Sequence, residues 1–148
     1  MHYILYNFIW CDILISKLDH LNLSVHDFDE TVAWYNKIFC FTVVEEGVDD
    51  GLKWGVIQCN DAMLCIYEAP ELIHADRFKM KEKGVHYLAH FGLRVTDKKS
   101  WEKKIKEEKL PILYDGVVHW PNSLAWYIKD PTGWEIEVVY WHDDIIRF

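Results

Sequence analysis

A strand-like run near the end of the chain, DPTGWEIEVVYW, carries two carboxylates where its composition predicts burial. Its first four residues, 130–133, are a turn signal, and the residues that follow alternate as in a β-strand. Glu135 and Glu137 share one face of that strand with Val139 and Trp141, and the opposite face is apolar. Because a buried carboxylate must be paired, protonated or bound to a metal, the strand predicts one of these roles for its glutamates.

Two histidines join this carboxylate strand as candidates for metal binding. The segments LDHLNLSVHD (residues 18–27) and LAHFGLRVTD (88–97) align at an offset of 70 residues and agree at five of ten positions. The alignment makes His20 and His90 equivalent. A lone strand histidine is usually structural, but an equivalent pair together with Glu137 matches the ligand set of open two-histidine, one-carboxylate sites. Such sites bind Fe(II), Zn, Ni, Mn or Co; an ion pair at a sheet edge is the other interpretation of Glu137.

The elements that must position these residues are themselves repeated. After each histidine segment, an aspartate suited to capping precedes an amphipathic helix, and three strand candidates follow. In the first module the predicted helix is 28–39, and the strands after it are 41–46, 52–58 and 62–68. In the second module the predicted helix is 98–110, and the strands after it are 111–118, 123–129 and 134–141. The sequence thus predicts an α+β fold of tandem βαβββ modules, about 17–70 and 86–141, within a single domain at 17–148. Residues 1–16 are predicted to be an N-terminal arm or an extra strand.

The composition narrows the classes of partner. Half of the 148 residues are hydrophobic, and the formal net charge of -8 argues against a nucleic-acid or anionic membrane surface. Four cysteines without C-x-x-C spacing indicate free thiols in a reducing cytoplasm. The apolar opening segment is too short for a membrane span and lacks signal-peptide features. We therefore expect a cytoplasmic protein.

Two motifs resemble one known family. LDHLNLSVHDFDETVAWYNKIFCFTVVEE is similar to the opening of a glyoxalase/bleomycin-resistance/dioxygenase domain, also called the vicinal oxygen chelate (VOC) superfamily, and YIKDPTGWEIE resembles its closing motif. The resemblance covers residues 17–141. It implies a cup-shaped mixed sheet around a divalent metal held by His20, His90 and Glu137, with Glu135 solvated or paired nearer the rim. It also implies a homodimer by default, with the modules closing one cup within the chain or pairing across two chains.

One position departs from the family pattern. Glyoxalase I-like members have a fourth ligand, a glutamate that closes the first module, where this chain has Cys65. Cys65 is interpreted as a small buried hydrophobic residue or as a thiolate ligand favouring zinc. In a third interpretation Glu68 reaches the site, although it lies on the opposite face of its strand.

The resemblance also suggests which residues are catalytic. Glu137 is expected to shuttle a proton, as in glyoxalases, and Tyr127 has the spacing of a tyrosine found in extradiol dioxygenases. The other interpretation of Tyr127 is a packing role, since an aromatic residue at this position is common across the superfamily. His74 and His86 are candidates, by position alone, for the acid/base histidine of those dioxygenases.

The sequence therefore predicts a divalent-metal-dependent enzyme that chelates vicinal oxygens of a small organic substrate. The reaction is of the lyase/isomerase type or of the ring-cleavage dioxygenase type, so a lyase activity and an oxidoreductase activity are both open. The alternative is a non-catalytic protein that sequesters a drug, as bleomycin-resistance proteins do. A scaffold for protein partners has no supporting feature beyond the N-terminal arm.

Overall fold

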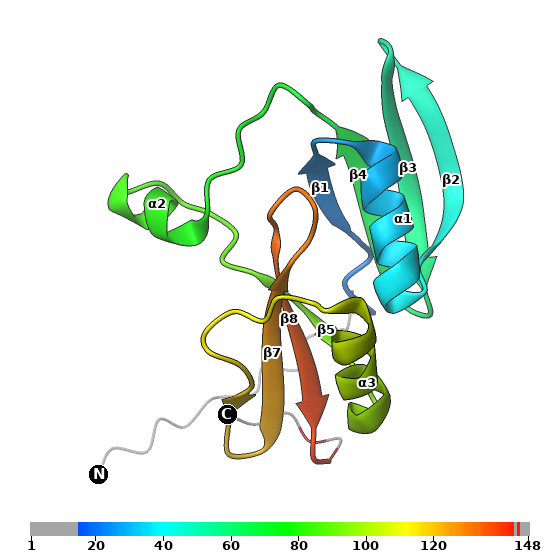
Figure 1. Ribbon diagram of the computed structural model, residues 1–148. Helices are drawn as coiled ribbons and strands as arrows, with labels where there is room; N and C mark the ends of the chain where they lie inside the picture. Colours follow the sequence, from blue (N-terminus) through cyan, green and yellow to red (C-terminus); the bar gives the residue numbers. More distant parts are fainter. Residues whose placement is uncertain (1–14, 144, 146–148) are drawn as a thin grey trace.

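The computed structural model describes residues 15–143 and 145, and it has the predicted tandem βαβββ organisation (Figure 1). The first module consists of β1 (Leu21–Val25), α1 (Phe28–Phe39), β2 (Thr42–Asp49), β3 (Leu52–Cys59) and β4 (Ala62–Glu68). A linker with the short helix α2 (Arg77–Glu82) leads to the second module. That module consists of β5 (Phe91–Arg94), α3 (Lys98–Glu108), β6 (Val118–His119), β7 (Ser123–Lys129) and β8 (Glu135–Trp141).

Each module folds into a four-stranded mixed sheet, and the two sheets have the same topology. The strand orders are β1-β4-β3-β2 and β5-β8-β7-β6. In both sheets the opening strand lies parallel to the closing strand. The register pairs Asn22 with Cys65 in the first sheet and Gly92 with Glu137 in the second. The duplication inferred from the sequence is therefore confirmed, together with the α+β class.

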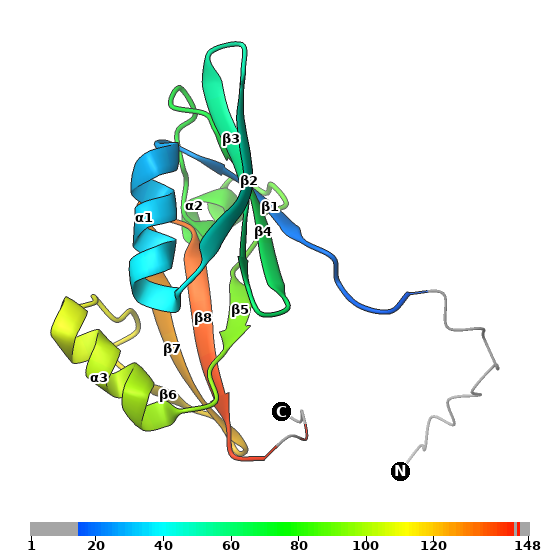
Figure 2. The same ribbon diagram turned by 90° about the vertical axis from the view of Figure 1, so that its right-hand side faces the viewer.

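A helix of its own module lies against one face of each sheet. Helices α1 and α3 lie on the same side of the molecule (Figure 2). Leu23 and Val25 of β1 and Ile66 of β4 are buried in the core. Because side chains alternate along a strand, Cys65 and Tyr67 of β4 face the other way. We call this helix-free side of the first sheet its open face.

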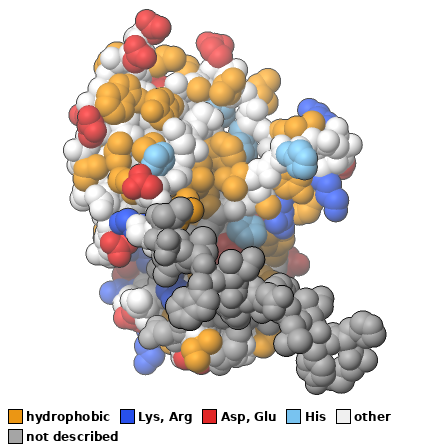
Figure 3. Space-filling view, turned by 180° about the vertical axis from the view of Figure 1, so that it is seen from behind, with side chains coloured by type: hydrophobic (Ala, Val, Ile, Leu, Met, Phe, Trp, Pro, Cys, Tyr) orange, Lys and Arg blue, Asp and Glu red, His pale blue; other side chains and the backbone are white. Residues whose placement is uncertain are grey.

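The first sheet leaves several large apolar side chains exposed. The side of the molecule opposite to the helices carries hydrophobic side chains mixed with acidic and histidine side chains (Figure 3). The exposed hydrophobic residues of the first sheet are Val43, Val44 and Val48 of β2, Leu52 of β3 and Tyr67 of β4. Leu52 and Tyr67 lie on the open face of the sheet. Val43 and Val48 pair with Ile57 and Lys53, so their side chains lie on the helix side.

Helix α1 contacts the second module at α3 and at the turn between β7 and β8. Phe39 at the end of α1 stacks on Trp101 of α3, with ring centroids 5.6 Å apart and an interplanar angle of 16°. The Tyr35 hydroxyl of α1 donates a hydrogen bond of 3.2 Å to the carboxylate of Asp130, which lies buried between β7 and β8. The core thus contains buried residues of both modules.

Both long helices begin at the aspartates that the sequence nominates as caps. The Asp27 carboxylate accepts a hydrogen bond from the Glu30 backbone N–H over 2.8 Å, and Asp97 accepts one from the Ser100 N–H over 3.1 Å. These bonds satisfy N–H groups of the first helical turn that have no partner within the helix.

We expect Asp27→Ala to lower the free energy of unfolding by about 1 kcal/mol, because the substitution removes this cap. Asp27→Asn keeps an acceptor oxygen and should remain close to the wild type. Urea denaturation followed by circular dichroism measures both. Equal losses for the two variants would show that charge, and not the capping bond, stabilises α1.

The predicted strand over residues 111–118 is wrong for most of its length, because only Val118 of that range belongs to a strand. Tyr114, Asp115 and Gly116 have positive φ angles of 57°, 61° and 122°. Three such residues in a row cannot continue a β ladder. The Asp-Gly pair is the turn signal that marks this loop in the sequence.

Helix α2 in the linker is a second departure, since the sequence predicts no helix there. It begins at Asp76, whose carboxylate accepts hydrogen bonds from the backbone N–H groups of Phe78 and Lys79 over 3.0 and 3.1 Å. The helix is only six residues long and has no buried residue, so it lacks a hydrophobic stripe by which sequence periodicity reveals a helix.

The predicted N-terminal arm, residues 1–16, lies outside the described residues except for its last two positions. In the described part of the chain, no helix has both the length and the apolar composition needed to cross a lipid bilayer.

Candidate metal centre

The second sheet brings three of the predicted site residues together. His90 directly precedes β5, and its Nε2 lies 3.3 Å from Oε2 of Glu137 on the neighbouring strand β8. Tyr127 of β7 stands opposite Glu137 in the register of the sheet, and its hydroxyl donates a 2.8 Å hydrogen bond to Glu137 Oε1. The His90 and Tyr127 rings pack edge to face with centroids 5.5 Å apart. We refer to His90, Tyr127 and Glu137 as the His90 cluster.

The His90 cluster has the chemistry and spacing of a partial metal site. Two adjacent ligands at about 2.1 Å from one ion lie about 3.0–3.4 Å apart in octahedral or tetrahedral geometry. The 3.3 Å between His90 Nε2 and Glu137 Oε2 falls in that range. Both side chains are partly exposed, so an ion can reach them. This pair therefore fits two neighbouring ligands of a divalent ion.

Tyr127 is protonated in this setting. Burial and the hydrogen bond to Glu137 raise the pKa of Tyr127 to about 12. Tyr127 thus orients Glu137 as a hydrogen-bond donor and is a poor general base near neutral pH.

Glu135 lies beside the His90 cluster and is paired, which is one of the two states expected for it. Its side chain is only 9% exposed. Oε2 accepts a 2.8 Å hydrogen bond from the Tyr114 hydroxyl. Oε1 lies 3.7 Å from Arg77 Nη1 and 3.9 Å from His90 Nδ1. Sequence reasoning missed both Tyr114, which falls in the wrongly predicted strand, and Arg77, which has no motif around it.

His20 does not join the His90 cluster. It precedes β1 of the first sheet, its side chain is 43% exposed, and its Nδ1 lies 2.8 Å from the Asp19 carboxylate. Among the described residues, no three His, Cys, Asp or Glu side chains lie close enough together to hold a metal ion. The three predicted ligands therefore do not meet within one chain as described.

Cys65 occupies the position in the first sheet that Glu137 occupies in the second. It pairs with Asn22 of β1 as Glu137 pairs with Gly92 of β5. Burial and, to a smaller extent, the charge of Asp19 raise the pKa of the Cys65 thiol. In the metal-free protein, a raised pKa favours the neutral thiol over the thiolate. Cys65 is half-buried, so it is not the fully buried hydrophobic residue of the first interpretation.

Glu68 has a structural role at the end of β4. Its two carboxylate oxygens accept hydrogen bonds from the backbone N–H groups of Phe28 and Lys53, each over 3.1 Å. These bonds fix the start of α1 and the start of β3. The carboxylate is therefore engaged on the helix side, away from the open face.

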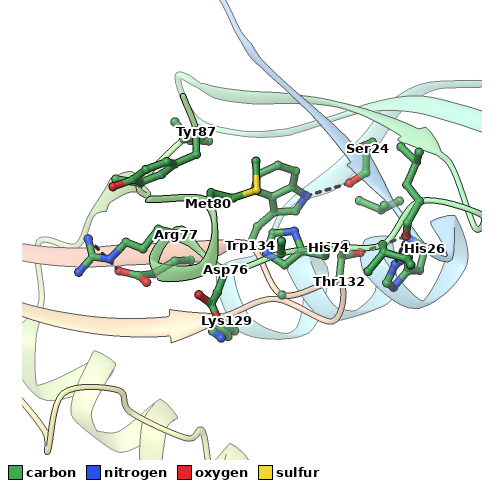
Figure 4. A pocket seen from close by; sticks show the side chains of 18 of the residues that line it. Ser24, His26, His74, Asp76, Arg77, Met80, Tyr87, Lys129, Thr132 and Trp134 are labelled. Atoms are coloured by element: carbon green, nitrogen blue, oxygen red, sulfur yellow. Dashed lines mark hydrogen bonds and ion pairs between the residues drawn. The ribbon is translucent and has the colours of Figure 1, made fainter. Parts of the chain in front are cut away.

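His74 and His86 line a cavity of about 340 Å³ between the linker and the junction of the modules. His74 packs against the Trp134 indole with ring centroids 4.8 Å apart, and the two lie side by side in Figure 4. Burial lowers the pKa of His74, which therefore favours its neutral form. Neither histidine has a described contact with the residues of the His90 cluster.

This linker cavity adjoins the His90 cluster. Arg77 and Glu135 line the cavity, and Glu135 also faces His90. Figure 4 shows Arg77 reaching away from Trp134 along one end of the cavity, while His26 and Thr132 lie at the other. The linker thus approaches the candidate site through Arg77.

Comparisons with known proteins agree with this architecture. A family model described as the Glyoxalase/Bleomycin resistance protein/Dioxygenase superfamily matches residues 17–138. No protein of curated function matches the chain significantly.

Several solved structures share the fold. A glyoxylase/bleomycin resistance protein/dioxygenase domain from Frankia sp. EAN1pec is 14% identical with a TM-score of 0.70, covering 88% of this chain and 96% of that one. A lactoylglutathione lyase from Agrobacterium tumefaciens is 23% identical with a TM-score of 0.61, covering 86% and 95%. The fosfomycin resistance protein FosX from Listeria monocytogenes, in complex with Mn(II) and sulfate, is 18% identical with a TM-score of 0.63, covering 86% and 93%. The family match spans most of the sequence, and the chain therefore belongs to the glyoxalase/bleomycin resistance protein/dioxygenase superfamily.

Proposed function

We propose that this protein is a divalent-metal-dependent enzyme that binds two neighbouring oxygens of a small organic substrate. The observation that carries the proposal is the 3.3 Å approach of His90 Nε2 to Glu137 Oε2, with Tyr127 bonded to the other carboxylate oxygen. One of the similar structures is a complex with Mn(II), which supports a metal-dependent reaction here, and another is a lyase. A lyase or isomerase reaction and a ring-cleaving dioxygenase reaction both suit this site.

In this proposal His90 and Glu137 are two metal ligands, and His20 is the third. A bound divalent ion supplies Lewis-acid chemistry, stabilising negative charge on substrate oxygens. Tyr127 holds Glu137 Oε1 and leaves Oε2 directed at His90. Because this hydrogen bond already restricts the Glu137 side chain, the carboxylate loses little rotational freedom when it binds a metal ion. Since Tyr127 keeps its proton, it serves as a donor to Glu137 or to a substrate oxygen.

We further propose that His20 reaches the site from a second copy of the chain. His20 is exposed at the entrance to β1, and Leu52 and Tyr67 leave apolar surface uncovered on the open face of the first sheet. A twofold dimer that places the open face of one first sheet over the His90 cluster of the other chain creates two equal sites. Each site then combines a histidine from one chain with a histidine and a carboxylate from its partner.

A mixed dimer tests this arrangement. We expect homodimers of His20→Ala and of Glu137→Gln each to bind almost no metal. Co-expression with two affinity tags isolates the dimer of one chain of each kind, in which one of the two shared sites keeps all three ligands. We therefore expect about half of the wild-type metal content in the mixed dimer. A mixed dimer as empty as the homodimers would place each site within a single chain.

The metal that is found with the purified protein directs the choice of substrate. Iron favours catechol ring cleavage, and zinc, nickel or cobalt favours hemithioacetal and epimerase substrates. Turnover that is lost on chelation and restored on reloading is the result expected of an enzyme. The drug-sequestration alternative instead predicts that a planar drug binds equally well to metal-free and metal-loaded protein.

Two further predictions stay open. The described cysteines Cys40, Cys59 and Cys65 are free thiols, in line with the predicted cytoplasmic location. The domain limits of 17–148 also remain a prediction.

A further inference from the structure

We propose that Glu135 is a positioning residue that fixes the imidazole of His90, and that Tyr114 and Arg77 hold Glu135 for this task. The inference rests on the proposed function, because its purpose is to present His90 Nε2 to a metal ion. It assigns a role to three side chains that lie outside the predicted set of ligands.

The two nitrogens of His90 face two different carboxylates. Nε2 lies 3.3 Å from Glu137, and Nδ1 lies 3.9 Å from Oε1 of Glu135. Among the described residues, neither Nδ1 nor that Glu135 oxygen has a hydrogen-bond partner, and both atoms are buried. Buried polar atoms are almost always paired, so these two are natural partners. A shift of about 1 Å brings them to hydrogen-bond distance.

Such a bond selects one tautomer of the imidazole. When Nδ1 carries the proton and points at Glu135, Nε2 keeps its lone pair for a metal ion. A carboxylate in this place also makes the imidazole a stronger ligand and fixes the orientation of its ring. Glu137 then binds the ion directly, while Glu135 acts through His90.

Tyr114 anchors the far oxygen of Glu135. Its hydroxyl donates to Oε2 over 2.8 Å, which leaves Oε1 on the side of His90. Tyr114 has a φ of 57°, in the left-handed region that bulky residues rarely adopt. The backbone N–H of Leu113 donates to the carbonyl of Tyr127 over 2.8 Å, which ties the strained loop to β7. Strain of this kind is typical of residues held in place for function.

Arg77 compensates the charge of the buried carboxylate. Its Nη1 lies 3.7 Å from Glu135 Oε1, and its guanidinium lies 5.4 Å from the centre of the Tyr114 ring. A buried carboxylate without a cation nearby would be costly to keep charged. Through Arg77, the linker helix α2 therefore contributes to a site that is otherwise built from strands.

Metal affinity of the full-length protein provides the first test, with Co(II) as the probe in competition with a chromophoric chelator. We expect Glu135→Leu, which removes charge and acceptor, to weaken Co(II) binding by about 10–100-fold. Glu135→Gln keeps an acceptor and should lose less, and Tyr114→Phe should lose less still. The matched control Glu82→Gln, at an exposed position of α2, should retain wild-type affinity.

The tautomer of His90 provides a second readout that needs no metal. The Glu137 carboxylate also attracts a proton to Nε2 when no metal is bound, so this readout uses the Glu137→Gln background. In ¹⁵N-histidine-labelled, metal-free Glu137→Gln protein, long-range ¹H–¹⁵N spectra should show the proton of His90 on Nδ1, and adding Glu135→Leu should give a mixture of tautomers. Wild-type affinity and an unchanged tautomer in both Glu135→Leu and Tyr114→Phe would overturn the inference. If the wild type binds no Co(II) but Glu135→Leu still changes the tautomer, the positioning holds and the proposed metal function fails.

Discussion

The Glu137→Gln variant is expected to lose stoichiometric binding of divalent metal while keeping its fold. Glutamine has the same shape and can still accept the hydrogen bond from Tyr127, so the sheet around it has no reason to change. It lacks the anionic oxygen that now lies 3.3 Å from His90 Nε2. Since loss of an outer-shell partner alone costs about 10–100-fold in metal affinity, loss of a ligand should cost roughly 100-fold or more. Isothermal titration with Co(II), Ni(II) and Zn(II) measures this loss.

Tyr127→Phe is the matched control, because it removes the hydrogen bond to Glu137 but no proposed ligand. This variant should still bind metal at the wild-type stoichiometry. His90→Ala should behave like Glu137→Gln. Full metal affinity in Glu137→Gln would mean that the ligand assignment is wrong, even if the overall fold is right.

Asp130→Ala is expected to cause the largest loss of stability among these variants, about 3 kcal/mol in the free energy of unfolding. Oδ1 of Asp130 accepts hydrogen bonds from the backbone N–H groups of Gly133 and Trp134, each over 2.8 Å, and Oδ2 accepts one from Tyr35. Alanine leaves these donors without an acceptor in a region where Asp130 is only 5% exposed. Urea denaturation measures the change.

Asp130→Asn separates the role of the hydrogen bonds from that of the charge. Asparagine keeps an acceptor oxygen for both backbone N–H groups, so it should lose much less stability than alanine. Burial raises the pKa of Asp130, which means that folding favours its protonated form. This contribution is complete below the ordinary pKa of aspartate and is lost as the pH rises through the raised value. The wild type should therefore lose stability relative to Asp130→Asn across that interval, and parallel pH profiles would contradict this.

The fold was predictable because the sequence contains the same βαβββ pattern twice. The repeated histidine segments and the aspartate caps place the same elements at equivalent positions, and alternation identifies the core face of each strand. The loop at 114–116 was not predictable from alternation, because its apolar residues also suit a strand. Its left-handed backbone, and not its hydrophobicity, decides its structure.

The candidate site was predictable only in part. Parallel pairing of β5 with β8 brings His90 to Glu137, and the antiparallel β7–β8 register adds Tyr127, so these residues follow from the topology. The separation of His20 from these residues does not follow from the topology. His20 and His90 occupy equivalent positions in the two modules, but this equivalence does not determine how the two sheets face each other. Arg77 approaches Glu135 across a linker without regular periodicity, a tertiary contact that no local pattern encodes.

The metal content of the wild-type protein tests the central claim most directly. Purified, tag-free protein is reloaded with Fe(II), Mn(II), Co(II), Ni(II) or Zn(II), dialysed and analysed for metal by mass spectrometry. A site built from His20, His90 and Glu137 predicts close to one ion per chain for at least one of these metals. Absence of stoichiometric binding for every metal after reloading would contradict the proposal of a metal-dependent enzyme and leave drug binding as the function to test.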